Sequence, residues 1–167
     1  MSITKAKKKD IDNIMKMYAS CVKGMINIGI DQWDHTYPNK EIILQDIIKR
    51  NYFIYKIDNN IIGGVTIDTN QSPEYLQINW KDKKNDFLCV HRLAINHDFW
   101  MKGIGKEMMT FAEELAVSKK LSSIRLDTYS GNPGAMKFYK NLGYQNLGYI
   151  YLKPGKNEYY CFEKIIE

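Results

Sequence analysis

Two closely spaced glycines, Gly103 and Gly105, are the residues whose types and spacing most directly suggest chemistry. They follow an apolar segment, residues 87–95, and they open a predicted amphipathic helix. A glycine-rich turn at the start of a helix presents backbone N–H groups at the positive end of the helix dipole, where phosphate is stabilised. The apolar face of this helix repeats at helical spacing through Ile104, Met108, Phe111 and Leu115. We therefore predict a phosphate-binding turn over residues 101–106.

A second segment, residues 132–144, has the residues of a well-bounded helix. Asn132 is a favourable N-cap, Pro133 suits the first helical position, and Gly143 suits the position after the helix ends. Tyr139 lies on the apolar stripe of this helix, so its spacing alone predicts a core tyrosine. The same stripe contains Ala135, Phe138 and Leu142.

Two other glycine-rich phosphate motifs do not fit the first segment. A dinucleotide-binding fingerprint requires a third glycine where this chain has Met108. A Walker loop requires Gly where this chain has Trp100, and Ser or Thr where it has Glu107. Both motifs are therefore excluded.

Together the two segments resemble the signature motifs of the Gcn5-related N-acetyltransferase (GNAT) superfamily, in the form found in small bacterial members. The family's phosphate motif, Gln/Arg-x-x-Gly-x-Gly/Ala, is matched at both glycines, with Trp100 in place of the leading polar residue. Trp100 either stacks on the cofactor or covers the core. The second motif, Asn-x-x-Ala-x-x-Phe-Tyr-x-x-x-Gly-Phe/Tyr, is matched at every named position from Asn132 to Tyr144.

The resemblance implies an acetyl-coenzyme A (acetyl-CoA) donor and no metal. By analogy with the family, the main chain of Leu93, Ala94 and Ile95 would bind the pantetheine arm. The pyrophosphate would be held by the turn, that is by Met101, Lys102, Gly103, Ile104, Gly105 and Lys106. The second motif would add Asn132, Ala135, Phe138 and Tyr139 to the cofactor site.

The reaction implied by the resemblance is attack of a neutral amine on the acetyl thioester. The Leu93 N–H would stabilise the tetrahedral oxyanion, and Tyr139 would protonate the leaving sulfur as general acid. Some family members place a glutamate base three residues before the position of Arg92, where this chain has Cys89. His91, two residues later, has a suitable unperturbed pKa and is the candidate base, although a packed or exposed strand histidine is the alternative.

The acceptor is expected to bind at the irregular aromatic segment of residues 32–38. Trp33, Asp34 and Tyr37 combine aromatic faces with a carboxylate, which suits a cationic amine of a small molecule or peptide. The alternative is that these aromatics fill the core beneath a loop. Two other functions stay open: a non-catalytic acyl-CoA-binding module, and acetyl transfer to aminoacyl-tRNA.

Composition limits the partners and the compartment. The 167-residue chain has a net charge of +5, and its 24 basic residues are dispersed, which disfavours nucleic acid. No apolar run is long enough for a membrane span, and the N-terminus has no signal-peptide pattern. Three scattered cysteines indicate reduced core thiols and a cytoplasmic protein. A homodimer could form through the final hairpin.

The predicted element order matches the GNAT topology over one domain, residues 1–167. We expect an α+β protein, the α/β GNAT fold: a mixed, mostly antiparallel, twisted sheet of about seven strands, flanked by about four helices and splayed between strands four and five. Residues 71–84 are expected to form a long loop or weak strand. The other strands are expected at residues 3–6, 52–57, 61–68, 87–95, 124–129, 144–152 and 158–166, and the helices near 10–24, 39–50, 104–119 and 133–142.

Overall fold

The computed structural model describes residues 2–166, which form two compact units. Among the described residues, unit 1 comprises residues 2–67 and His91–Phe111, and unit 2 comprises Asp68–Val90 and residues 112–166. Two elements run through both units: strand β4 (Phe87–Ile95) and helix α3 (Ile104–Ser118). Unit 1 also contains β1 (Ser2–Lys5), α1 (Ile11–Asn27), α2 (Lys40–Ile48), β2 (Tyr52–Ile57) and β3 (Asn60–Asp68, whose last residue falls in unit 2). Unit 2 also contains β5 (Ser123–Tyr129), α4 (Pro133–Asn141), β6 (Gln145–Ile150) and β7 (Tyr159–Ile165).

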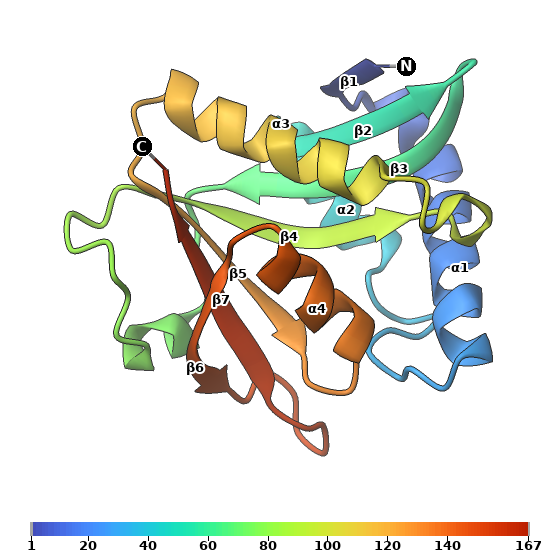
Figure 1. Ribbon diagram of the computed structural model, residues 1–167. Coiled ribbons are helices and arrows are strands. Elements are labelled where there is room, and N and C mark those ends of the chain that lie inside the picture. The colour runs from blue at the N-terminus through green and yellow to red at the C-terminus, as the bar shows by residue number, and fades with distance from the viewer. Residues whose placement is uncertain (1, 167) are drawn as a thin grey trace. The chain divides into compact units, whose positions relative to one another are not determined.

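The strands follow the order β1-β2-β3-β4-β5-β7-β6 (Figure 1). The β4–β5 pair is parallel, whereas β1–β2, β2–β3, β5–β7 and β6–β7 are antiparallel. The parallel register joins Phe87 to Ser123 and ends where Cys89 lies opposite Arg125. This mixed, mostly antiparallel sheet with its four α-helices confirms the predicted fold class.

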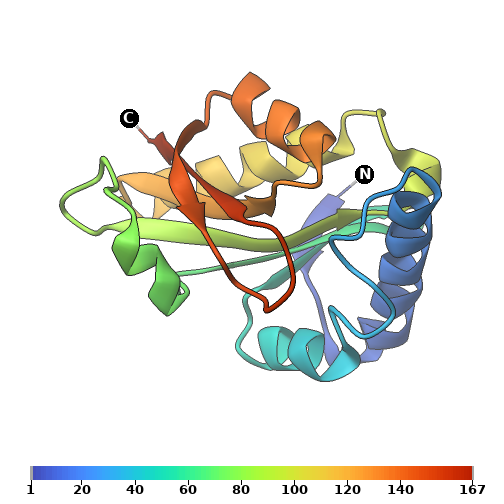
Figure 2. The same ribbon diagram turned by 90° about the horizontal axis from the view of Figure 1, so that it is seen from below.

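In unit 1, the alternation of side chains along β2 explains the layering. Tyr52 and Ile54 are buried in one apolar cluster with α1 and α2. The intervening residues face the first half of α3: Phe53 packs on Phe111 with ring centroids 5.0 Å apart, and the Tyr55 hydroxyl donates to Glu107. The strands therefore lie between α2 on one side and the start of α3 on the other (Figure 2).

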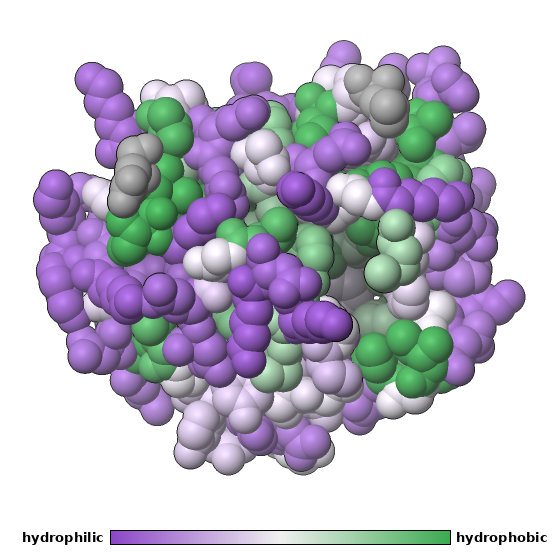
Figure 3. All heavy atoms as spheres, viewed as in Figure 1, coloured by the Kyte–Doolittle hydropathy of each residue, from purple (hydrophilic) through white to green (hydrophobic). Residues whose placement is uncertain are grey.

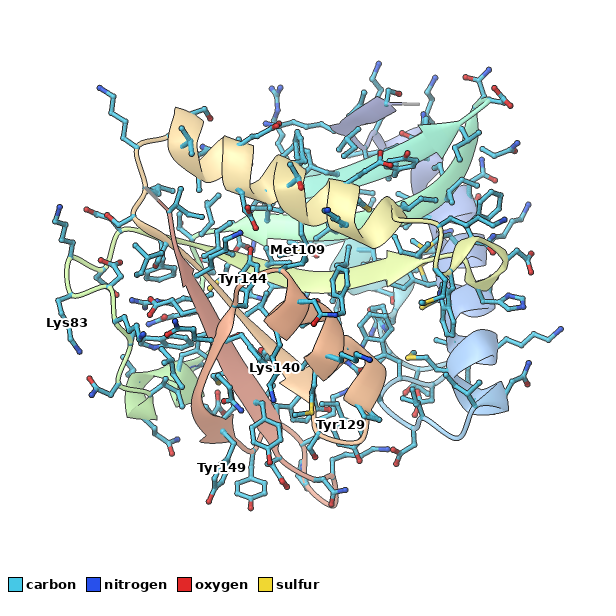
Figure 4. The ribbon with its side chains drawn as sticks, in the orientation of Figure 1. Lys83, Met109, Tyr129, Lys140, Tyr144 and Tyr149 are labelled. Carbon is cyan, nitrogen blue, oxygen red and sulfur yellow. The ribbon has the colours of Figure 1, made fainter. Side chains whose placement is uncertain are left out.

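In unit 2, the same alternation divides β5 into two faces. On one face Phe162 of β7, opposite Leu126, packs on Tyr139 of α4 with centroids 6.0 Å apart. Tyr144, labelled in Figure 4, follows α4 and donates its hydroxyl to Glu113 of α3 at 3.2 Å. The other face of β5 carries Arg125, Asp127 and Tyr129, and a short 3-10 helix, η2 (Pro73–Gln77), contributes Tyr75 to the buried cluster there.

Of the two alternatives for residues 71–84, the loop is confirmed: the segment contains η2 and loops, and no strand is described there, because Pro73 and the surrounding polar residues favour a turn over a strand ladder. The expectations for the first long helix need correction. Helix α1 continues past Gly24 to Asn27. Asp10 begins that helix without a side-chain cap bond; its carboxylate accepts instead from the Lys7 N–H at 2.8 Å.

The described surface has no feature of a membrane span. None of the helices within residues 2–166 combines the length and the apolar composition that crossing a membrane requires. Hydrophilic side chains cover most of the face seen in Figure 3, and the hydrophobic ones form small separate groups.

Candidate active site

The glycine turn in unit 1 has the backbone of an anion-binding loop. Met101 and Gly103 both adopt left-handed conformations, with φ of 62° and 84°. Such residues orient successive N–H groups toward one point. The Glu107 N–H makes an early helical bond of α3, to the Gly103 carbonyl at 3.1 Å. The preceding N–H groups of the helix, including those of Gly105 and Lys106, belong to the first turn, which has no intrahelical acceptors.

The side chains of this turn leave its backbone approachable. Met101, Lys102 and Gly103 are all exposed, and no atom lies within 4 Å of the position that a Gly103 Cβ would take. Lys106 is exposed, whereas the Lys102 ammonium lies over the Phe99 ring, 4.7 Å from its centroid. Ile104 is buried and anchors the helix to the core.

Trp100 covers the core. Its indole packs against the unit 1 core, and its Nε1 donates to the Ile95 carbonyl at 2.8 Å. A Cβ at Gly24 of α1 would lie 3.0 Å from the indole, so ring and helix are in close contact. Of the two roles left open for Trp100, the structure favours the structural one. The Ile95 carbonyl has a second lone pair, so Ile95 stays a candidate for pantetheine binding.

The main chain of β4 changes direction at Arg92, which has a left-handed φ of 54°. After this residue the strand is regular, and the Asn96 N–H donates to the Ile62 carbonyl of β3 at 2.8 Å. Main-chain groups alternate in direction along a strand, and β3 and β4 run in opposite directions (Figure 1). The amide of Ala94 is therefore directed toward β3, and that of Leu93 to the opposite side.

Arg92 is held by three elements of unit 1. Its Nη2 donates to Asp46 of α2 at 2.5 Å, and its side chain also hydrogen bonds to Tyr37. Its carbonyl accepts from the Tyr18 hydroxyl of α1 at 2.7 Å. Asp46 accepts in addition from Thr66 of β3 at 2.7 Å. This network fixes the left-handed residue that immediately precedes Leu93, the predicted oxyanion donor.

The predicted acceptor residues lie in one loop but have different local roles. Trp33 is half-buried against the unit 1 core, with its ring edge on Tyr18 at 5.8 Å between centroids. The exposed Asp34 accepts from the Thr36 N–H at 2.7 Å and from its hydroxyl at 2.6 Å; these hydrogen bonds lower the pKa of Asp34. Asp34 is therefore ionised and holds its own turn.

His91 is half-buried on β4, near the end of its pairing with β5. Its role as base stays a prediction.

In unit 2, Asn132 and Tyr139 occupy the predicted positions on α4. The Asn132 side chain accepts from the Ala135 N–H at 3.0 Å, which confirms the predicted cap. Tyr139 is buried, and its ring contacts those of Phe138, Tyr144 and Phe162. Burial, and second the charge of Asp127, raise the pKa of Tyr139. The protonated phenol can donate a proton, which is what a general acid must do.

Sequence reasoning missed Asp127. This half-buried residue of β5 accepts from the Tyr75 hydroxyl of η2 at 2.6 Å. The two residues are 52 positions apart, and residues 71–84 gave no sequence signal of a contact. Within residues 2–166, no three His, Cys, Asp or Glu side chains gather as a metal ion would require.

The comparison with known families decides the identity. The profile described as the Acetyltransferase (GNAT) family matches residues 20–144, which include both motifs. The chain belongs to the GNAT acetyltransferase family. It is thus an acyltransferase by descent, and the resemblance of its two motifs to that family is confirmed.

Individual relatives of this GNAT acetyltransferase match it over nearly its full length. It is 25% identical over 161 residues to the uncharacterized N-acetyltransferase YesJ of Bacillus subtilis, covering 95% of this chain and 86% of that one. A GNAT-family acetyltransferase structure from Streptococcus agalactiae is 26% identical with a TM-score of 0.84, covering 99% and 95%. PaiA N-acetyltransferase of Thermoplasma acidophilum, solved with coenzyme A, shares the fold at 18% identity and a TM-score of 0.74, covering 98% of each chain.

Proposed function

We propose that this GNAT acetyltransferase transfers the acetyl group of acetyl-CoA to a primary amine of a small molecule or peptide, by direct attack in a ternary complex. The observation that carries the proposal is the turn before α3. Two left-handed residues, Met101 and Gly103, precede the N-terminus of a 15-residue helix, at the position of the family's phosphate motif. A diphosphate is the ligand chemistry that such a turn suits.

The proposed donor site uses main chain more than side chains. The N–H groups of residues 101–106 would bind the pyrophosphate, with the exposed Lys106 adding positive charge. The Lys102 ammonium would have to move away from the Phe99 ring before its charge could act on the pyrophosphate. The main chain of Leu93, Ala94 and Ile95 would bind the pantetheine amides; the Leu93 amide, unlike that of Ala94, is directed away from β3. The coenzyme A bound to the PaiA relative supports this donor.

The chemistry proposed for the two motifs is one substitution at the acyl carbon. The amine nitrogen forms a bond to that carbon, the carbonyl becomes an oxyanion, and the Leu93 N–H stabilises it. When the C–S bond breaks, the sulfur takes the electron pair and a proton from the Tyr139 hydroxyl. The nitrogen then loses one proton, which restores the Tyr139 hydroxyl, so a neutral amine and acetyl-CoA give the acetylated amine and coenzyme A.

The acceptor would bind on unit 1, near the aromatic loop. Trp33 is only half-buried and could contact the acceptor, and the ionised Asp34 supplies negative charge. Tyr37 is already bonded to Arg92, so its contribution to the acceptor would be through its ring. Cytoplasmic location and a homodimer stay predictions; β6, which carries the exposed Tyr149 seen in Figure 4, is the edge strand for such pairing.

A calorimetric titration with acetyl-CoA tests the donor, with NAD and ATP as controls. We expect saturable one-site binding of acetyl-CoA alone. A panel of a polyamine, an aralkylamine and a peptide with a free N-terminus then tests for turnover. Binding without turnover on any amine would favour the acyl-CoA-binding module. Strongly salt-dependent RNA binding would favour aminoacyl-tRNA as acceptor. No binding at all would reject the proposal.

A further inference from the structure

Two buried tyrosines of unit 1 form a chain of hydrogen bonds that ends on the main chain of β4. The Tyr18 hydroxyl of α1 donates to the Arg92 carbonyl at 2.7 Å, and the hydroxyl oxygens of Tyr52 and Tyr18 lie 3.1 Å apart. A carbonyl has no hydrogen to give, so Tyr18 uses its single proton there and accepts from Tyr52. The chain therefore runs in one direction, from Tyr52 through Tyr18 to Arg92.

The core of unit 1 holds both hydroxyls in place. Tyr18 and Tyr52 are buried, and burial raises the pKa of each, so both keep the protons that they donate. Gly64 of β3 leaves the space that the Tyr52 hydroxyl occupies, because a Cβ at position 64 would collide with it. The packing therefore fixes the first donor of the chain as well as the second.

The last member of the chain is the peptide group that contains the Leu93 N–H. The Arg92 carbonyl and the Leu93 N–H belong to one planar trans peptide, in which these two groups point in opposite directions. Tyr18 therefore donates to the peptide on one side, and Leu93 donates on the other. In a low-dielectric interior, hydrogen bonds in a chain polarise and strengthen one another. The bond from Tyr18 thus makes the Leu93 N–H a stronger donor and fixes its direction.

We propose that Tyr18, supported by Tyr52, is a positioning residue that orients and polarises the Leu93 N–H toward the thioester carbonyl of acetyl-CoA. The inference rests on the proposed function, in which this N–H is the oxyanion donor. Negative charge on the carbonyl oxygen grows as the amine attacks, so the chain stabilises the transition state more than the bound donor. Loss of the chain should therefore lower kcat and leave the affinity for acetyl-CoA unchanged.

The infrared band of the bound thioester carbonyl gives the most direct test. The probe is acetyl-CoA isotopically labelled at that carbonyl, bound without an acceptor amine. In the wild type, the hydrogen bond from Leu93 should lower the frequency of the band relative to acetyl-CoA in buffer. Tyr52→Phe should lose about 10–30% of this shift, which is the strengthening expected from one bond of a chain. Tyr18→Phe should lose more, because the peptide also loses the contact that orients it.

Steady-state kinetics give a second measurement, with the amine of the panel above that is acetylated fastest. We expect kcat to fall about tenfold in Tyr18→Phe and about twofold in Tyr52→Phe, less than the roughly 100- to 1,000-fold loss that follows complete removal of an oxyanion donor. Calorimetry should give the wild-type affinity for acetyl-CoA in both variants. General damage to the core would lower affinity and kcat together, so this comparison separates positioning from a merely structural role.

Tyr55→Phe is the matched control. Tyr55 lies on the same strand as Tyr52 but faces α3, where its hydroxyl donates to Glu107 at 2.8 Å. The variant loses one hydroxyl and one hydrogen bond outside the chain, so its carbonyl band and its kcat should equal those of the wild type. A loss of the shift as large as that in Tyr18→Phe would contradict the inference.

The outcomes separate the two proposals. If the wild type binds no acetyl-CoA, or binds it without a shift of the band, the Leu93 donor of the proposed function fails and the inference fails with it. If the wild type shows the shift and Tyr18→Phe keeps all of it, only the inference is overturned. Should circular dichroism show that Tyr18→Phe does not fold, Tyr52→Phe carries the test, and an unmoved band in that variant overturns the inference equally.

Discussion

At the scale of single residues, Tyr139 combines a core position with a chemical role. Its ring is buried among three other aromatic rings, and burial raises the pKa of its hydroxyl, so the phenol stays protonated at neutral pH. We expect Tyr139→Phe to keep acetyl-CoA affinity and to lower kcat at least about tenfold. Calorimetry and steady-state kinetics check the two halves of this prediction. An unchanged kcat would remove Tyr139 from the mechanism.

The three cysteines are free and buried, as the sequence predicted. Burial raises the pKa of Cys21 to about 11 and that of Cys161 to about 12, and it also raises the pKa of Cys89. Because the thiolate is the reactive form, the native protein should not react with a thiol reagent at neutral pH. Unfolding in denaturant should release all three thiols. A colorimetric thiol titration with and without denaturant measures both, and rapid labelling of the native protein would contradict the burial.

The sequence predicted the structural role of residues that act through their own backbone preferences. It did not predict the role of residues that depend on contacts distant in sequence. The conformational preferences of Asn132, Pro133 and Gly143 predict the two ends of a helix, and the structure has that helix. Arg92 gives no such signal, because an arginine is not expected at a φ of 54°; its anchors, Tyr18 and Asp46, are distant in sequence. Asp127 was missed for the same reason.

At the scale of elements, the turn before α3 depends on the left-handed conformation of Gly103. Gly103→Val should strain the backbone by about 1–2 kcal/mol, because a side chain at positive φ crowds the following carbonyl. The turn would then relax and misdirect its N–H groups. We expect acetyl-CoA affinity to fall at least about tenfold. Calorimetry measures this loss.

A matched control exists in the same chain. Gly155, in the loop between β6 and β7, also has a positive φ, of 71°, and no atom lies within 4 Å of its would-be Cβ. Gly155→Val should therefore introduce similar strain and a similar loss of thermal stability while leaving acetyl-CoA binding intact. Equal losses of affinity in both variants would show that the glycine turn has no specific part in binding.

At the scale of the whole molecule, the two compact units share two continuous elements. β4 and α3 each continue from one unit into the other without a break. If one unit unfolded alone, both the strand and the helix would be interrupted part-way along their length. We therefore expect one cooperative unfolding transition, as the predicted single domain implies.

Arg125 allows a direct test of this cooperativity. It is 1% exposed in unit 2, paired with Glu163 and Asp82 and packed between the rings of Trp80 and Phe87. Arg125→Leu leaves two buried carboxylates uncompensated, which should cost about 3–5 kcal/mol. In a Trp80→Phe background, the remaining tryptophan fluorescence reports unit 1 alone. Its denaturation midpoint should fall together with the far-ultraviolet circular dichroism midpoint; an unmoved fluorescence midpoint would show independent units.

The contact between Trp100 and Gly24 has a consequence for how the sequence can change over evolutionary time. A Cβ at position 24 would lie 2.6 Å from the Cβ of His97 and 3.0 Å from the indole, so no other residue fits while both side chains remain. A relative that regains the usual Gln or Arg at position 100 loses the indole, and its hydrogen bond to Ile95, at the same time. Position 24 should nevertheless stay glycine among homologues wherever position 97 carries a Cβ, because that contact remains after the indole is lost.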